Sequence, residues 1–238
     1  NLLVLGKGLQ MNRVERNVKS TAWDRLVHSS SEYFRRKRGA LFREALPDFT
    51  SLKICDVGGS RHFWEKQDAV NVPGDITLVN IRDDGQARSF GGGFGHMKVV
   101  LYDGEHLPFE DKSFDVAVCN SVIEHVPLHL RANLVKEVQR VSNYFFIQTP
   151  AFIFPIEPHF FCPALHWLPR SVARHAVRIS PWRFMSKPTE EHIKDYFNEI
   201  QILTLKEFQG YAPNAKLSTE WFMGVPKSYT LYGPSNPQ

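Results

Sequence analysis

The pattern of apolar and polar positions predicts a series of short strands in the first two thirds of the chain. Each predicted strand is a short, mainly apolar run that ends in, or runs into, a glycine, a proline or a polar residue; the segments are 52–57, 76–81, 98–104, 113–121 and 143–148. Such runs are typical of parallel strands buried on both faces. Residues 126–141 have the apolar spacing of a helix. The pattern therefore indicates an α/β domain.

The pattern changes on both sides of this region. Apolar residues at near-helical spacing predict one or two helices over 12–46. Glycine is so dense in 83–95 that we expect a loop or a shortened helix there. After the fifth strand, 189–197 predict a helix with a capping start, and 199–208 and 221–232 predict the last two strands.

Residues 151–187 differ from the rest in composition. They contain five prolines, which exclude one long helix, and seven phenylalanine and tryptophan side chains. We expect an insertion built of short helices, such as 168–177, whose aromatic residues line a pocket or form a core.

Composition places the chain among globular proteins. A chain of 238 residues with 42% hydrophobic and 23% charged residues fits one α/β domain. The net charge of +4 is smaller than that of a nucleic-acid-binding protein, and no apolar run reaches the roughly 20 residues of a membrane helix. Three scattered cysteines favour reduced thiols and a cytoplasmic location.

The first predicted strand runs into the turn Asp56-Val57-Gly58-Gly59-Ser60. Glycine has no Cβ atom, so a ligand can approach this backbone closely, and N–H groups beyond it can face the ligand. The turn lacks both the Gly-Lys-Ser/Thr ending of a P-loop and the full G-x-G-x-x-G pattern. It indicates a ligand at the carboxyl end of the strand, or a tight turn with no ligand.

Three motifs in this order resemble the class I methyltransferases that depend on S-adenosyl-L-methionine (SAM), of the small-molecule group called type 11. They are Asp56-Val57-Gly58-Gly59, residues 103–109 and residues 114–126. The resemblance covers 50–150 and implies SAM as the cofactor. It also implies a Rossmann-like sheet of seven strands, the last one antiparallel, in a single domain over 1–238. In that domain 12–46 is an N-terminal helical cap, 50–150 the SAM-binding core and 151–187 a lid or acceptor-binding insertion.

The same resemblance assigns the parts of SAM to the strand ends. Asp56 meets the methionine ammonium, and Asp103 accepts a hydrogen bond from the adenine amine. The family has an acid for the ribose after the second strand, whereas this chain has Asn80, which still bonds to hydroxyls but carries no charge. The predicted cofactor-binding residues are Asp56, Gly58, Gly59, Ser60, Asn80, Ile81, Asp103, Gly104, Glu105, Asn120 and Ser121.

Methyl transfer also needs an aligned acceptor, a dry site and often a base. Histidine can act as a base near neutral pH, and His125 and His159 both follow strands at the predicted cofactor end of the sheet. Either is a candidate base; the alternative is that they cap loops or pack in the lid. Glu157, His159 and Cys162 match no standard zinc spacing, so no metal is predicted.

These features favour O-methylation of a small molecule such as a sugar, a lipid or another specialised metabolite. The alternatives are N- or C-methylation of a small molecule, and an inactive SAM-fold protein with a binding or regulatory role. A nucleic-acid methyltransferase favours Asn/Asp-Pro-Pro-Tyr/Phe after the fourth strand, where this chain has Asn120-Ser121-Val122-Ile123. We expect a small-molecule substrate, no nucleic acid and no membrane span; the sequence sets no oligomeric state.

Overall fold

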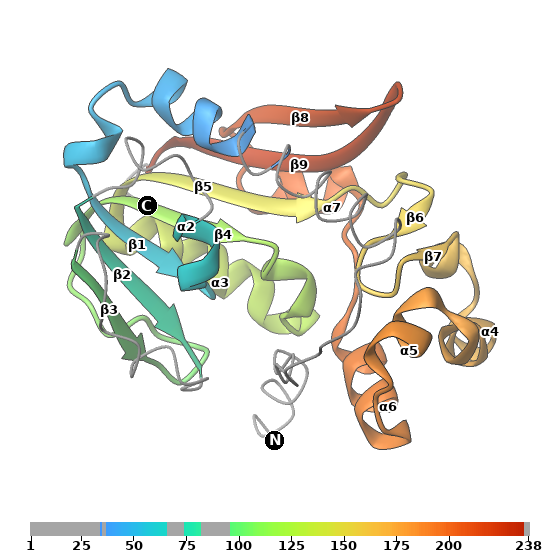
Figure 1. Cartoon of the computed structure of the whole chain (residues 1–238). Helices are drawn as coiled ribbons and strands as arrows, with labels where there is room; N and C mark the ends of the chain where they lie inside the picture. Colours follow the sequence, from blue (N-terminus) through green and yellow to red (C-terminus); the bar gives the residue numbers. More distant parts are fainter. Residues whose placement is uncertain (1–33, 35–36, 66–73, 82–95, 236–238) are drawn as a thin grey trace.

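The computed structural model describes residues 34, 37–65, 74–81 and 96–235, and its centre is a seven-stranded sheet (Figure 1). The strand order is β3-β2-β1-β4-β5-β9-β8. Strands β1 to β5 are parallel, β9 is antiparallel to β5, and β8 is antiparallel to β9. The bounds are β1 Lys53–Val57, β2 Asp75–Asn80, β3 His96–Leu101, β4 Phe114–Asn120, β5 Ser142–Pro150, β8 Lys216–Phe222 and β9 Val225–Pro234. The predicted Rossmann-like sheet with an antiparallel last strand is confirmed.

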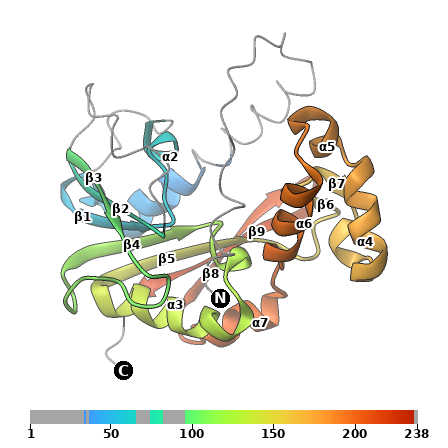
Figure 2. The same ribbon diagram turned by 90° about the horizontal axis from the view of Figure 1, so that it is seen from below.

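Helices cover both faces of this sheet (Figure 2). Helices α3 (Leu128–Val141) and α7 (Leu205–Tyr211) lie on one face. The helical segment 37–45 and α2 (Arg61–Glu65) lie on the other. The protein is therefore a three-layer α/β structure, as expected when parallel strands must be covered on both sides.

Each face of the sheet has its own apolar core. Phe208 of α7 belongs to the core on the α3 side, whereas Phe42 and Trp64 belong to the opposite core. Adjacent residues of β1 divide between them, because successive strand side chains point to opposite faces: Ile54 packs in one core and Cys55 in the other.

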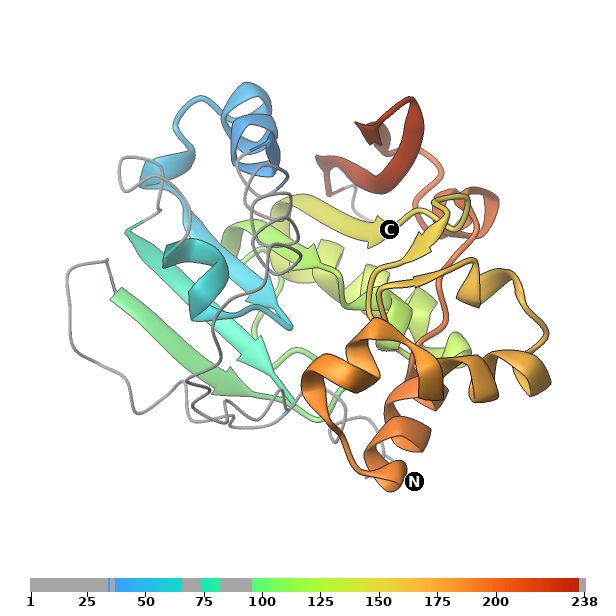
Figure 3. The ribbon, with the colours of Figure 1, turned by 45° about the vertical axis from the view of Figure 1, so that its right-hand side comes forward.

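Residues 156–200 form a small lobe beyond the carboxyl end of β5 (Figure 3). Its core is built around Phe160, Trp182 and Ile193. Prolines define its short helices, since Pro169 directly precedes α4 and Pro181 is the first residue of α5. The lobe contains β6 (Ile156–Glu157), β7 (Cys162–Pro163), η6 (Leu165–Trp167), α4 (Arg170–Ala176), η7 (Val177–Ile179), α5 (Pro181–Ser186) and α6 (Glu190–Glu199).

Two expectations for the end of the chain are wrong. Residues 199–208 are no strand: α6 ends there and α7 begins after Thr204, whose hydroxyl accepts a hydrogen bond from the N–H of Glu207 at 3.2 Å. This Thr-x-x-Glu start is a helix signal that outweighs the local apolar spacing. The single strand predicted at 221–232 is a hairpin of β8 and β9, whose turn residues Met223 and Gly224 have φ values of 48° and 80°.

Some predicted elements lie outside the described residues. They are the part of the 12–46 helices before residue 34 and the loop expected at 83–95. Within the part of the chain that is described, no helix combines the length and the apolar composition that crossing a membrane requires.

Candidate functional site

The turn between β1 and α2 is held closely against the sheet. Gly58 donates its N–H to the carbonyl of Val79 at 2.7 Å and has a φ of 69°, in the left-handed region. A Cβ at Gly58 would lie 2.4 Å from a methyl of Val122, and one at Gly59 would lie 2.0 Å from the carboxyl group of Asp56. The need for glycine at both positions therefore comes from packing within the protein and does not depend on a ligand.

Asp56 lies beneath this turn, with 1% of its surface exposed. Its Oδ2 accepts a hydrogen bond from the indole of Trp64 at 2.8 Å, while its Oδ1 is buried without a partner among the described residues. Burial raises the pKa of Asp56 to about 7, against the opposing effect of the Trp64 hydrogen bond. An unpaired buried carboxylate oxygen fits a cationic ligand group such as an ammonium.

Asn80 and Ser60 stabilise the same turn. The Asn80 amide donates one N–H to the carbonyl of Gly59 at 3.1 Å, so its second N–H and its oxygen are left for a further ligand. The hydroxyl of Ser60 accepts from the N–H of Phe63 at 3.3 Å, at the start of α2. Ile81 follows directly after β2 and is half-buried.

Asp103 occupies an exposed loop after β3. Its Oδ1 accepts hydrogen bonds from the backbone N–H groups of Glu105 at 2.8 Å and His106 at 2.7 Å. These bonds hold the pKa of the Asp103 carboxyl below its ordinary value, and Gly104 turns the chain with a φ of 90°. The second carboxylate oxygen of Asp103 takes no part in these two bonds, so it can accept from a ligand amine.

The carboxyl end of β4 brings Asn120 and Ser121 beside the glycine turn. Ser121 has a φ of 55°, and its hydroxyl donates to Oε1 of Gln148 at 2.8 Å. The Oδ1 of Asn120 is buried and has no hydrogen-bond partner among the described residues. Val122, two residues after Asn120, faces Gly58. Asn120 and Asp56 thus supply two acceptor atoms that await a donor, as a methionine ammonium requires.

Beyond this end of β4 lies a group that we call the histidine–glutamate cluster: Glu124, His125, Glu157 and His159. The Nδ1 of His159 lies 2.6 Å from Oε1 of Glu157, whose Oε2 accepts from the N–H of Phe160 at 2.7 Å. The Nε2 of His159 lies 3.8 Å from Oε1 of Glu124. The ring centroids of His125 and His159 are 4.9 Å apart, and the rings are perpendicular.

The pKa values in the cluster are shifted by burial and by neighbouring charges. Burial lowers the pKa of His125 to about 3, and His159 and Arg131 act in the same direction. Burial also lowers the pKa of His159, but Glu157 and Glu124 outweigh it, so the net shift is upward. Burial raises the pKa of Glu124, opposed by His159.

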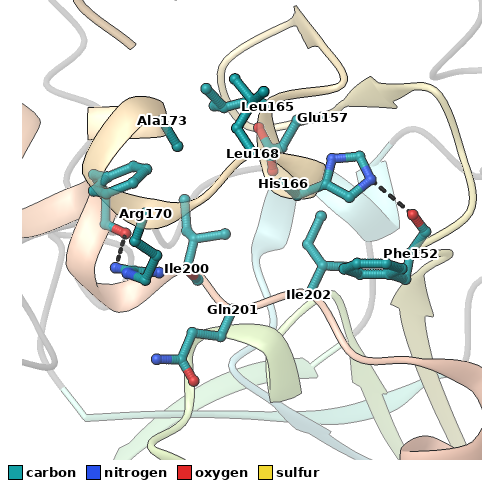
Figure 4. A pocket seen from close by; sticks show the side chains of 11 residues that line it. Phe152, Glu157, Leu165, His166, Leu168, Arg170, Ala173, Ile200, Gln201 and Ile202 are labelled. Carbon is teal, nitrogen blue, oxygen red and sulfur yellow. Dashed lines mark hydrogen bonds between the residues drawn. The ribbon is translucent and has the colours of Figure 1, made fainter. Parts of the chain in front are cut away.

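A pocket of about 240 Å³ opens in the lobe beside this cluster (Figure 4). Glu157, which holds His159, also lines the pocket. The remaining walls come from Phe152, Phe197 and the segments 165–173 and 200–202. Two polar groups on the walls are engaged within the protein: His166 Nε2 lies 2.7 Å from the carbonyl of Phe152, and Arg170 donates to the carbonyl of Phe197 at 3.1 Å. Nδ1 of His166 is buried without a partner among the described residues.

The structure brings the two predicted catalytic histidines together, although 34 positions separate His125 from His159. It also shows partners that sequence reasoning missed. Trp64 holds Asp56, and Glu124 faces His159. For the contact between Glu124 and His159, the sequence offered one signal: the adjacent acid and histidine Glu124-His125 after the fourth strand.

The structure also places three possible metal ligands together, which the spacing of these residues in the sequence did not indicate. Glu124, His125 and His159 each offer one ligand atom, and these atoms lie within 4.8 Å of one another, so the three residues can hold a metal ion. Cys162, considered as a ligand from the sequence, is not in this group; its thiol lies 3.9 Å from the carbonyl of Pro163.

Comparison with known proteins agrees with this geometry. Residues 61–143 match the family model described as a methyltransferase domain. No curated protein matches the sequence. Among solved structures, magnesium protoporphyrin IX methyltransferase from Synechocystis PCC 6803 with bound SAH (S-adenosylhomocysteine) has a TM-score of 0.56 at 10% identity, covering 93% of this chain and 90% of that one.

Two other solved structures have the same fold. A SAM-dependent methyltransferase from Mesorhizobium loti has a TM-score of 0.50 at 14% identity, over 82% of this chain and 96% of that one. A methyltransferase solved with the Haloferax volcanii Trm112 methyltransferase activator has a TM-score of 0.55 at 12% identity, over 91% and 96%. At these identities the likeness concerns the fold.

The family match and the fold confirm the class predicted from the three motifs. Residues 61–143 match a methyltransferase domain, and the fold is that of solved SAM-dependent methyltransferases, one of which holds bound SAM. The unpaired oxygens of Asp56 and Asn120 and the exposed carboxylate of Asp103 fit the donors that this cofactor presents.

Proposed function

We propose that this protein transfers the methyl group of SAM to a hydroxyl group of a small molecule, such as a sugar, a lipid or another specialised metabolite. The position of Glu157 carries the proposal, because this residue both lines the lobe pocket and holds His159. A pocket of about 240 Å³ suits a small acceptor. The solved neighbour named magnesium protoporphyrin IX methyltransferase is consistent with a small-molecule acceptor on this fold.

We propose that the cofactor lies across the carboxyl ends of β1 to β4. SAM supplies a methyl group activated on a sulfonium sulfur. Asp56 and Asn120 accept from its ammonium, Asn80 bonds the ribose through its oxygen or its second N–H, and Asp103 accepts from the adenine amine. The backbones of the remaining predicted residues complete the contact: Gly58, Gly59, Ser60, Ile81, Gly104, Glu105 and Ser121.

The acceptor end of the proposed site consists of His125, His159 and their surroundings. Tyr196 packs near both rings, with centroids 6.2 Å from each, and helps to exclude water. The acceptor oxygen bonds to the methyl carbon as the carbon–sulfur bond breaks. The sulfur keeps the electron pair of that bond, and the hydroxyl proton passes to His125 or His159, the two candidate bases.

The same proposal covers the domain organisation, the class of acceptor and the location of the reaction. Residues 151–187 bind the acceptor, and the chain 1–238 is one domain. The acceptor is a small molecule and not a nucleic acid. We place the reaction in the cytoplasm, in keeping with the free thiols of Cys55, Cys119 and Cys162.

Affinity for SAH is expected to depend on pH through Asp56. The pKa of this buried carboxyl is raised to about 7, so it is half protonated near neutral pH before the ligand binds. An ammonium favours the ionised form, so SAH should bind about tenfold more weakly for each pH unit below 7. The neighbouring thiols of Cys55 and Cys119 stay neutral, because burial raises the pKa of both.

Calorimetry between about pH 5.5 and 7.5 tests this expectation. The matched variant is Asp56→Asn, which keeps the size of the side chain but cannot ionise. Its SAH affinity should be weaker and independent of pH. Equal pH profiles in the two proteins would show that Asp56 does not meet the ammonium.

The proposed reaction is tested with SAM labelled in its methyl group. The purified chain is incubated with separate panels of hydroxyl, amine and carbon-acid small molecules, and with RNA and DNA. Label in a hydroxyl compound, with equal release of SAH, is the expected result. Label only in amines or carbon acids would replace O-methylation by N- or C-methylation, and label only in nucleic acid would overturn the small-molecule proposal.

A further inference from the structure

We propose that Glu124, His125 and His159 bind a divalent transition-metal ion such as Zn²⁺, and that the acceptor hydroxyl completes its coordination. The proposal rests on the proposed function and changes the role of the histidines within it: they hold an ion beside the acceptor. Two histidines and one carboxylate, with a position left open for substrate, form a common catalytic zinc site.

The geometry of the three donors carries the proposal. Their ligand atoms all lie within 4.8 Å of one another. Zinc bonds to histidine nitrogen and carboxylate oxygen are about 2.1 Å long, so two ligands of one ion are at most about 4.2 Å apart. His159 Nε2 and Glu124 Oε1, at 3.8 Å, already satisfy this limit. The donor atom of His125 is at most 4.8 Å from each of the other two, slightly above this limit.

The surroundings of the donors are those of a supported metal site. Metal-binding histidines usually donate their second ring nitrogen to a carboxylate, which fixes the ring. His159 has this arrangement, because its Nδ1 lies 2.6 Å from Glu157 and its Nε2 faces Glu124. Glu124 is oriented in turn by Thr149, whose hydroxyl donates to Oε2 at 3.1 Å and leaves Oε1 free.

Burial supplies the second, independent observation. Glu124 has no exposed surface, yet its Oε1 has no hydrogen-bond partner among the described residues, and the same is true of the buried Nδ1 atom of His125, a residue that is otherwise half-buried. Unpaired buried polar atoms are costly and call for an ion or a water. The nearby cation Arg131 does not serve, because its guanidinium is bound to Val126, Gln201 and Glu207.

An ion at this position has a clear consequence for the reaction. A metal-bound hydroxyl loses its proton far more readily than a free one. The acceptor oxygen would then bond to the methyl carbon as the carbon–sulfur bond breaks, with the electron pair left on sulfur and the proton passed to water. No histidine has to take that proton.

The test is metal binding by the full-length protein without SAM. The protein is treated with a chelator and titrated with Zn²⁺ by calorimetry, and with Co²⁺ by visible absorption. We expect one equivalent to bind, with Mg²⁺ at least about tenfold weaker because it prefers oxygen ligands. Binding of Zn²⁺ no tighter than Mg²⁺, or no binding to the folded protein, would overturn the proposal.

Variants localise the ion. Glu124→Gln keeps the side-chain shape and the acceptor for Thr149, and should weaken Zn²⁺ binding by more than about 100-fold; Glu157→Gln, one step removed, should weaken it by about 10–100-fold. The control is His129→Ala, an exposed histidine on α3. Unchanged Zn²⁺ affinity in Glu124→Gln would place any bound ion elsewhere and overturn the site. SAH binding is measured in the same samples. If the protein binds SAH but no metal ion, the metal site is refuted and the proposed function stands. If the protein binds the metal ion but no SAH, the proposed function is refuted.

Discussion

Replacing His159 by asparagine is expected to lower the rate of methyl transfer by about 10²–10⁴-fold while SAH affinity stays within about twofold. Asparagine places an amide near the position of Nδ1, where it can still donate to Glu157, but it has no atom at the position of Nε2. His159 Nε2 is the atom that faces Glu124, 3.8 Å away. The loss is expected whether this nitrogen takes the acceptor proton or holds an ion.

The measurement compares turnover and SAH calorimetry in the same preparations of wild type, His159→Asn and His129→Ala. A structural role for His159 would lower stability and leave turnover per folded molecule unchanged. That result, or normal turnover in His159→Asn, would remove His159 from the acceptor site. Loss of SAH binding together with turnover would assign His159 to the cofactor end instead.

Gly58→Ala is expected to destabilise the protein by about 2–5 kcal/mol and to weaken SAH binding at least about tenfold. About 1–2 kcal/mol comes from the left-handed backbone at a φ of 69°, and about 1–3 kcal/mol from the clash with Val122, which a Cβ would approach to 2.4 Å. SAH affinity falls because the displaced turn carries Asp56 and Gly59, two of the predicted cofactor-binding residues.

Gly224→Ala is the matched control. Gly224 also has a left-handed φ, of 80°, but a Cβ there would meet nothing within 4 Å. Chemical denaturation should therefore show only the backbone cost in this variant. The double variant Gly58→Ala with Val122→Ala should recover part of the loss. Equal stability of Gly58→Ala and Gly224→Ala would show that the turn does not pack as described.

The sheet could be predicted from the sequence because its strands are nearly continuous apolar runs. The run at β1 was predicted to within one residue of its observed bounds, Lys53–Val57. Parallel strands buried on both faces produce this signal directly. The end of the chain lacks such continuous apolar runs, because the antiparallel hairpin of β8 and β9 is exposed in part. The two-residue turn of this hairpin also contains Met223, a residue with no turn preference.

Only the candidate site residues at or just after the ends of strands could be predicted from the sequence. Asp56 and Asn120 lie at the carboxyl ends of strands and His125 follows one, so their common location at one edge of the sheet could be inferred. Pairings across the fold could not, because they depend on where the lobe folds back. His159 meets Glu124 only because the lobe lies beyond β5 (Figure 3). The same long-range placement hid the candidate metal ligands.

Calorimetry of SAH binding tests the central claim most directly, in the wild-type protein and in Asp103→Ala. One SAH molecule should bind per chain. Asp103→Ala should bind it more weakly by about 1–3 kcal/mol, the loss expected for a hydrogen bond to a charged group. Glu110→Ala, at an exposed acid farther along the same loop, should bind like wild type. No heat and no thermal shift with SAH at millimolar concentration would contradict the assignment of SAM to this sheet edge.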